Sequence, residues 1–105
     1  MPPKPKFTKE MLIQTAIELA KEGGLEAIVA RNLGAKLDTA PSTIFTHFNS
    51  VEEIRQAVIA EARVLYNRYV EEGLRIVPPM KGFAVQYIRF AMEEPMLYSV
   101  LFMKK

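Results

Sequence analysis

Residues 33–48 read LGAKLDTAPSTIFTHF, and this stretch decides the fold. Its first half has the spacing of a short amphipathic helix, which ends where Asp38 tolerates a left-handed backbone better than most residues. Pro41 suits the first position of a second helix, in which Ile44 and Phe48 lie four residues apart and should pack inward. Two short helices joined by a tight turn indicate a helix-turn-helix, whose second helix is built to enter a DNA major groove.

A longer amphipathic helix is predicted before this stretch. Thr8 is placed as its N-cap, and Phe7 and Leu12 flank that cap as a hydrophobic staple would. Gly23 and Gly24 supply the stop signal at the other end. Apolar residues recur on one face at helical spacing, namely Leu12, Ala16, Leu19 and Ala20.

A long connector helix is predicted after the helix-turn-helix. A capping-box pattern opens at Ser50, and an apolar stripe continues to about residue 72. A Pro-Pro pair then marks a boundary, and two further amphipathic helices follow, divided by Pro95. The predicted apolar face of the first of them consists of Met80, Phe83, Ala84, Tyr87, Ile88 and Ala91. We therefore expect an all-α fold, with a three-helix head at residues 1–50 and, at residues 51–105, the connector and the start of a helical effector-binding and dimerisation domain.

The composition excludes several classes of function. The chain has 105 residues, no cysteine and one histidine, His47. Disulfides and thiolate chemistry are therefore absent, and nothing is spaced to make His47 a metal ligand or a catalytic base. Charged residues interrupt every apolar run, so no membrane-spanning helix is predicted. We expect a cytoplasmic protein that is not an enzyme, has no catalytic residues and carries no metal or other cofactor.

The charge pattern is only mildly basic. A net charge of +2 is low for a protein whose affinity comes from neutralising DNA phosphates. The N-terminal residues are more basic, because Lys4, Lys6 and Lys9 precede the first acidic side chain. This segment reads equally well as a basic arm that reaches DNA or as a solvated tail.

The ordered combination of motifs resembles the tetracycline-repressor (TetR) family of bacterial regulators. The resemblance covers about half of the chain, carried by GLEA at 24–27, Arg31, LG at 33–34, TIFTHF at 43–48, NSVEEI at 49–54 and, further on, FAMEEPMLY at 90–98. It implies a dimeric repressor whose heads bind a palindromic operator in double-stranded DNA. It also implies a helical C-terminal domain that dimerises and binds a small hydrophobic effector, of which this chain holds only the start.

The resemblance also assigns site residues. By position, Arg31 is where the family often contacts a phosphate, and Lys6 adds a basic side chain from the arm. A threonine can donate to phosphate and present its methyl group to thymine, although these residues could equally be plain exposed polar side chains. The residues on the family's recognition helix are Pro41, Ser42, Thr43, Phe45, Thr46 and His47.

A second site is implied in the later helices. Five apolar or aromatic side chains could line an effector pocket, although ordinary helix packing explains them equally well. They are Phe83, Tyr87, Phe90, Met92 and Tyr98.

The chain departs from the family pattern at five positions near the DNA-reading element. Phe45 stands where the family usually has tyrosine, Val51 where it has lysine, and Asp38 where the turn has glycine. Val29 and Ala40 occupy positions that often hold serine or threonine. Each missing contact would cost about 1 kcal/mol of binding free energy. The alternative function is therefore a helical protein-interaction module with a degenerate DNA-binding head.

Overall fold

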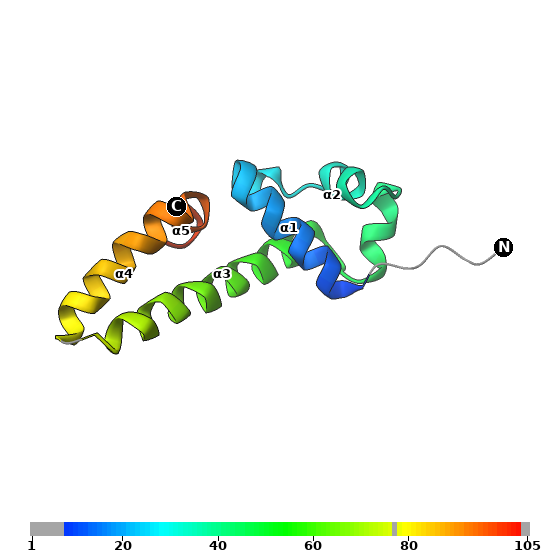
Figure 1. Cartoon of the computed structure of the whole chain (residues 1–105). Helices are drawn as coiled ribbons and strands as arrows, with labels where there is room; N and C mark the ends of the chain where they lie inside the picture. Colours follow the sequence, from blue (N-terminus) through cyan, green and yellow to red (C-terminus); the bar gives the residue numbers. More distant parts are fainter. Residues whose placement is uncertain (1–7, 77, 104–105) are drawn as a thin grey trace.

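The computed structural model describes residues 8–76 and 78–103, and over these residues the chain is helical, with no strand. The expected all-α fold is confirmed (Figure 1). The elements in chain order are α1 (Lys9–Gly23), η1 (Leu25–Ala27), α2 (Ala30–Leu37), η2 (Pro41–Thr46), α3 (Val51–Leu74), α4 (Pro79–Glu93) and α5 (Pro95–Phe102), where η marks a 3₁₀-helix.

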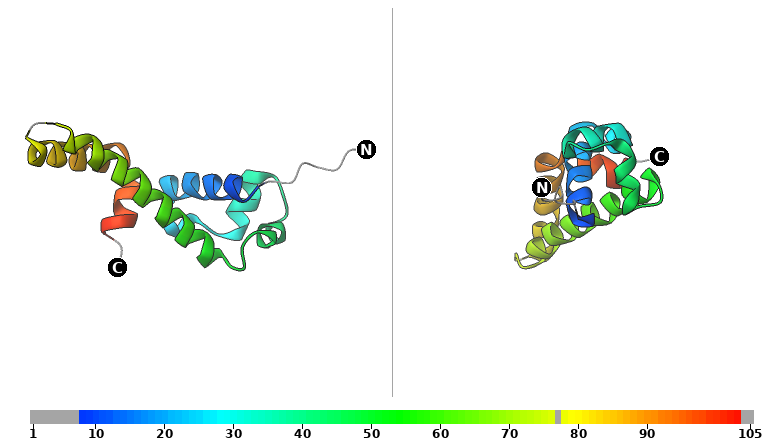
Figure 2. Two further views of the ribbon diagram at one scale, coloured as in Figure 1. Left: turned by 90° about the horizontal axis from the view of Figure 1, so that it is seen from below. Right: turned by 90° about the vertical axis from the view of Figure 1, so that its right-hand side faces the viewer.

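The helices form a head and a projecting arm (Figures 1 and 2). The head consists of α1, α2 and η2 gathered around the first half of α3. The second half of α3 leaves the head, and α4 returns antiparallel along it to make the arm. Helix α5 then turns back from the arm and packs against α1. The head is therefore connected to the arm twice, through the continuous α3 and through the contact between α5 and α1.

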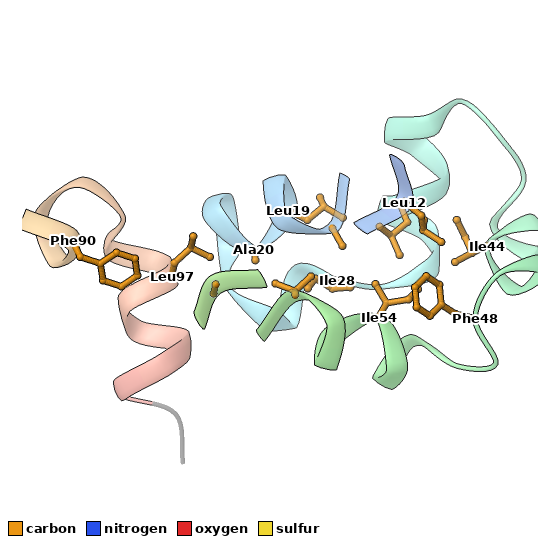
Figure 3. Close-up of a cluster of buried hydrophobic side chains, with 13 residues drawn as sticks. Leu12, Leu19, Ala20, Ile28, Ile44, Phe48, Ile54, Phe90 and Leu97 are labelled. Carbon is orange, nitrogen blue, oxygen red and sulfur yellow. The ribbon is translucent and has the colours of Figure 1, made fainter. Parts of the chain in front are cut away.

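The predicted core of the head is confirmed. Leu12, Leu33 and Ile44 are fully buried, and they pack with Ile54 of α3. Phe48 closes one end of this cluster and is only 7% exposed. The cluster continues without interruption towards Phe90 and Leu97 at the other end (Figure 3). The boundary predicted after residue 50 stays a prediction, because the buried side chains run across it.

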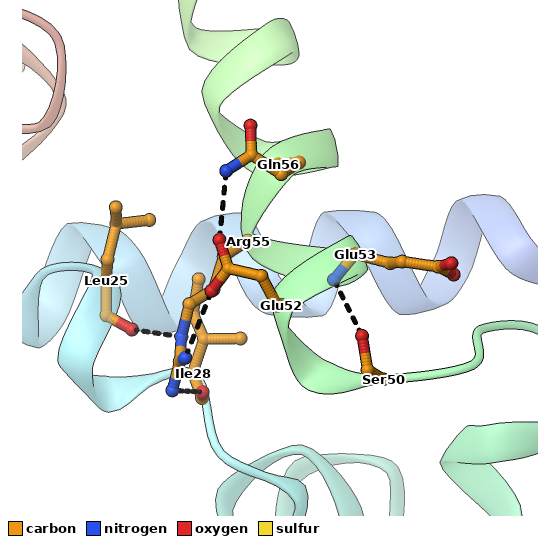
Figure 4. Close-up of polar contacts among 7 residues, drawn as sticks. All are labelled: Leu25, Ile28, Ser50, Glu52, Glu53, Arg55 and Gln56. Carbon is orange, nitrogen blue, oxygen red and sulfur yellow. Dashed lines mark hydrogen bonds and ion pairs between the residues drawn. The ribbon is translucent and has the colours of Figure 1, made fainter.

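Both predicted N-caps form. The Thr8 hydroxyl accepts a hydrogen bond from the Met11 amide at 3.0 Å and so caps α1. The Ser50 hydroxyl accepts from the Glu53 amide at 3.3 Å and caps α3 (Figure 4). The return bond of this capping box is shifted by one residue, because Glu53 accepts from the Asn49 amide at 3.0 Å.

The end of α1 also follows the prediction. Gly24 has φ = 79°, a conformation that favours glycine, and its amide donates to the Ala20 carbonyl at 2.8 Å. Phe7, one of the two residues of the predicted staple, lies outside the described residues.

The turn between α2 and η2 depends on a close approach of two backbone segments. Asp38 adopts the predicted left-handed conformation with φ = 55° and ψ = 51°. The Thr39 amide then donates to the Gly34 carbonyl at 2.9 Å. A Cβ atom on Gly34 would lie 2.8 Å from the Thr39 carbonyl oxygen and 3.2 Å from the Pro41 nitrogen. Only a glycine at this position leaves room for the turn.

The second helix of the motif differs in geometry from the expectation, because residues 41–46 form a 3₁₀-helix. The Thr43 amide bonds to the Ala40 carbonyl three residues back, at 3.0 Å, and the Thr43 hydroxyl donates to the same oxygen. Thr46 repeats this pattern by donating its hydroxyl to the Thr43 carbonyl at 2.9 Å. Such side-chain bonds to nearby carbonyls compete with the regular α-helical pattern and favour the tighter helix.

A pair of glycines, Gly73 and Gly82, brings α3 and α4 together at the tip of the arm. A Cβ atom on Gly82 would lie 1.9 Å from the Gly73 carbonyl oxygen, so the two backbones are in contact there. This contact sets which side of α4 faces α3, and it buries Gln86 and Phe90. Ile88 belongs to the predicted apolar face of this helix, but it is 57% exposed. The helix itself forms as predicted, but its buried face differs in part from the predicted apolar face.

Replacing Gly34 with alanine tests the closed turn. We expect Gly34→Ala to lower the free energy of unfolding by about 1–3 kcal/mol, as overpacking does, because the obstacle is backbone that cannot rotate away. Urea-induced unfolding followed by circular dichroism measures the change. Gly23→Ala is the matched control, because its new Cβ would meet only the Ala27 side chain, at 3.1 Å. Equal losses in the two variants would contradict this account of the turn.

Candidate nucleic-acid interface and effector region

The structure places the predicted DNA-contacting side chains mostly on the surface. Thr43 is half-buried, while Phe45 is 45% exposed despite being a large apolar residue. Lys6 lies outside the described residues. The remaining members of the predicted set are all exposed: Arg31, Pro41, Ser42, Thr46 and His47. DNA contact by these residues remains a prediction. The accessibility that it requires is present in every described member of the set except the partly buried Thr43.

The threonine hydroxyls on η2 are already engaged within the protein. Thr43 lies 2.8 Å, oxygen to oxygen, from the Thr39 hydroxyl and also donates to the Ala40 carbonyl. Thr46 donates to the Thr43 carbonyl. A hydroxyl has a single hydrogen to donate, so a bond to phosphate would require these internal bonds to break. The methyl group of the exposed Thr46 has no such constraint.

The electrostatics of the reading element are unusual for a DNA-binding surface. Residues 39–50 contain no lysine, arginine, aspartate or glutamate. Positive charge comes from nearby elements, because the Lys9 ammonium lies 5.1 Å from the centre of the Phe48 ring and Arg31 projects from α2. Asp38 adds an exposed carboxylate at the turn. Phosphate binding at this surface would therefore depend on Lys9 and Arg31.

Arg55 holds the head together in a way that sequence reasoning missed (Figure 4). Its guanidinium donates to the Ile28 carbonyl at 3.0 Å and to the Leu25 carbonyl at 3.3 Å, and it lies 3.5 Å from a Glu52 carboxylate oxygen. These bonds attach the connection between α1 and α2 to the start of α3. The Glu52 pairing was visible as an i, i+3 spacing, but the two carbonyls lie 27 and 30 residues away in the chain.

A second ion pair attaches α2 to α1. The Lys36 ammonium lies 3.0 Å from a Glu22 carboxylate oxygen and 4.0 Å from one of Glu18. Both glutamate side chains are largely exposed and the Lys36 side chain is about one-third exposed, so the pairing contributes at most about 1 kcal/mol. Its role is to orient α2, which carries Arg31.

Four of the five residues predicted to line an effector pocket lie in one aromatic network. The Tyr87 and Tyr98 hydroxyls are 2.8 Å apart, and their ring centres are separated by 5.7 Å. Phe83 lies beside Tyr87, with ring centres 6.2 Å apart. Phe90 is fully buried and packs edge-on against Tyr66 of α3, at 5.3 Å. These rings fill the space between α3, α4 and α5.

Met92 is the exception, because it lies outside this network. Its side chain is 76% exposed, and two residues along a helix place it on the side of α4 opposite Phe90. A role for Met92 in an effector pocket stays a prediction.

Three cavities in the described part of the chain lie elsewhere. One of about 210 Å³ opens between α1, α3 and α5, and another of about 310 Å³ lies between η1 and α5. A third, of about 200 Å³, lies between α3 and α4. None of the five predicted residues lines these three cavities. Ordinary packing therefore accounts for the aromatic side chains, and the effector pocket stays a prediction.

A charged cluster links the two helices of the arm. The Tyr69 hydroxyl donates to one oxygen of Glu93 at 2.5 Å, and the Arg89 guanidinium donates to the other at 2.7 Å. The hydrogen bond to Glu93 is the main reason that the pKa of Tyr69 is raised to about 12. Tyr69 and Arg89 in turn lower the pKa of Glu93.

Residues 8–76 and 78–103 lack two further classes of feature. No group of three or more histidine, cysteine, aspartate or glutamate side chains is arranged to hold a metal ion there. Within the same residues, no helix combines the length and the apolar character needed to cross a bilayer.

The Tyr69 contact gives a pH-dependent expectation. A raised pKa means that protonated Tyr69 stabilises the fold below its unfolded pKa of about 10, and this stabilisation is lost as the pH rises through about 12. We expect Glu93→Gln to shift the Tyr69 titration down towards 10, as measured by tyrosinate absorbance with Tyr69→Phe as the assignment standard. Glu61→Gln, a carboxylate elsewhere on α3, should leave it unchanged. An unaltered titration in Glu93→Gln would contradict the assignment.

Comparison with known proteins gives one informative likeness. No family model matches the chain, and no solved structure does. The chain is 24% identical, over 111 aligned positions, to the uncharacterized HTH-type transcriptional regulator YobS of Bacillus subtilis (strain 168). The alignment covers 99% of this chain and 56% of that protein, so the chain spans about half the length of the curated relative it matches.

Proposed function

We propose that this chain is the DNA-binding part of a helix-turn-helix transcription regulator, with η2 as the element that enters the major groove. The observation that carries the proposal is the closed turn at Gly34, which holds an exposed 3₁₀-helix at a fixed angle to α2. The likeness to an HTH-type transcriptional regulator supports the same function.

The packing around η2 suits this role. Ile44 and Phe48 are buried in the core of the head and anchor the segment, so the side chains on its solvent-facing side are held in fixed positions. Arg55 and Lys36 fix the neighbouring elements against α3 and α1. A base-reading element has to be held rigidly, because a displacement of about 1 Å is enough to lose a productive contact.

We further propose that the regulator is a repressor that binds a palindromic operator as a dimer and is released by a small hydrophobic effector. The proposal rests on the TetR-like motifs and on the two connections between the head and the arm. One connection is the continuous helix α3. The other is the packing of α5 on α1, where the Lys21 ammonium lies 3.6 Å from a Glu94 carboxylate oxygen. An effector that favours one arrangement of these helices would change the spacing of two heads and so shift the population away from the DNA-bound state.

The alternative is a helical interaction module that keeps the fold of a reading head without its DNA function. Specific observations favour it: residues 39–50 lack charge, the exposed Phe45 lacks a hydroxyl, and Asp38 places a carboxylate at the turn. Two substitution experiments separate the alternatives.

Arg31 is expected to contact a phosphate. Arg31→Ala should weaken binding to unrelated duplexes equally, and should reduce the slope of log K against log salt concentration by about 0.9, the value for one lost phosphate contact. Fluorescence anisotropy at several salt concentrations measures both. Arg75→Ala, which removes an exposed arginine at the far end of α3, is the matched control. Identical behaviour of the two variants would remove Arg31 from the interface.

Restoring the family's residues discriminates a weakened reader from an interaction module. Phe45→Tyr supplies a hydroxyl to a phosphate, and Val51→Lys supplies a charge at the start of α3. We expect each to raise DNA affinity roughly fivefold, the equivalent of one added hydrogen bond. Val51→Lys also lowers the free energy of unfolding, because it places a cation at the N-terminus of α3 and removes the packing of the partly buried Val51. No gain from either substitution would favour the interaction module.

A further inference from the structure

The exposed chemistry of η2 restricts which bases it can recognise, an inference that rests on the proposed DNA-binding function. Guanine is read chiefly by arginine or lysine, and adenine by asparagine or glutamine, each through paired hydrogen bonds. Residues 39–50 contain no arginine, lysine or glutamine. The usual readers of guanine are therefore missing from the element that would enter the groove.

The one carboxamide in this stretch is already committed. The Asn49 side-chain amide donates to Glu53 at 3.3 Å, and the Asn49 backbone amide donates to the same carboxylate at 3.0 Å. These bonds belong to the cap of α3. Using Asn49 to read adenine would break a contact that fixes the end of the reading element.

Apolar groups make up much of what η2 presents to solvent. The Phe45 side chain is 45% exposed, whereas the neighbouring Ile44 and Phe48 are buried in the core. Thr46 directs its hydroxyl to the Thr43 carbonyl, which leaves its methyl group as the free part of an exposed side chain. On the base edges of the major groove, the apolar partner for such groups is the 5-methyl of thymine.

We propose that η2 recognises its half-site by packing Phe45 and the Thr46 methyl group against thymine 5-methyl groups. Specificity then comes from apolar contact, and the recognised DNA carries thymines where this element lies. Ser42 and His47 add single polar contacts at the edge of the same surface.

The test removes only the methyl groups. Duplexes are selected from a randomised pool by the full chain at low salt, and each thymine of the selected site is then replaced by uracil. Uracil keeps the pairing, the charge and the polar groups of thymine, so any loss of affinity reports the methyl group alone. We expect a roughly fourfold loss at each contacted position, the value for one buried methylene-sized group.

A double-mutant cycle assigns the effect to a residue. In Phe45→Ala, uracil at the position read by Phe45 should cost nothing further, because the partner ring is already absent. Ile88→Ala is the matched control, since it removes an exposed apolar side chain from the arm and should leave the uracil effect intact. A further control replaces a contacted thymine with cytosine and then with 5-methylcytosine. The 5-methylcytosine duplex should bind more tightly than the cytosine duplex, because it restores the methyl group.

The outcomes separate this inference from the function beneath it. A chain that enriches no duplex overturns the proposed function and this inference together. A chain that enriches a duplex yet binds its uracil form equally well overturns the inference alone. Insertion of Phe45 into the minor groove would give this result, because the thymine methyl group lies in the major groove. A uracil effect that persists in Phe45→Ala overturns the assignment to Phe45.

Discussion

The close approach of two backbone segments at Gly34 is the constraint on which the rest of the head depends. The Thr39 carbonyl and Pro41 occupy the space in which a side chain would stand, and the left-handed Asp38 makes that approach possible. With the turn closed, Ile44 and Phe48 enter the core, and the opposite side of η2 faces solvent. The buried side chains fix the direction of η2, so the exposed Phe45 ring and the Thr46 methyl group are left available for recognition.

Polar contacts hold the head together and add to its attachment to the arm. Arg55 reaches two backbone carbonyls of the connection between α1 and α2, so this connection and the long helix move together. Near the same, C-terminal end of α1, the Lys21 contact with Glu94 and the packing of α5 provide a second attachment. A change in the arm would therefore act on the head through two attachments that meet at the C-terminal end of α1.

Local chemistry was predictable from the sequence, and long-range contacts were not. Thr8, Gly24 and Ser50 carry capping signals that act within a few residues, and all three cap as expected. The partners of Arg55 and the contact between Gly73 and Gly82 join segments that no local pattern relates. That glycine contact sets the buried face of α4, which is why apolar periodicity gave the helix correctly and still assigned the exposed Ile88 to its apolar face. The 3₁₀ geometry of η2 depends on threonine side-chain bonds whose rotamers sequence alone leaves open.

Affinity and specificity would have separate sources in this head. Affinity for phosphates depends on a few cations outside η2, because residues 39–50 carry no charge. If two methyl contacts per head are each worth roughly fourfold, one half-site gains roughly 16-fold, and two coupled heads gain roughly 250-fold. Specific regulators typically prefer their sites by about 10³ or more over other DNA. Methyl contacts alone therefore fall short of that preference, so the shortfall must be met by DNA shape, by Ser42 and His47, or by the geometric requirement that two heads engage together.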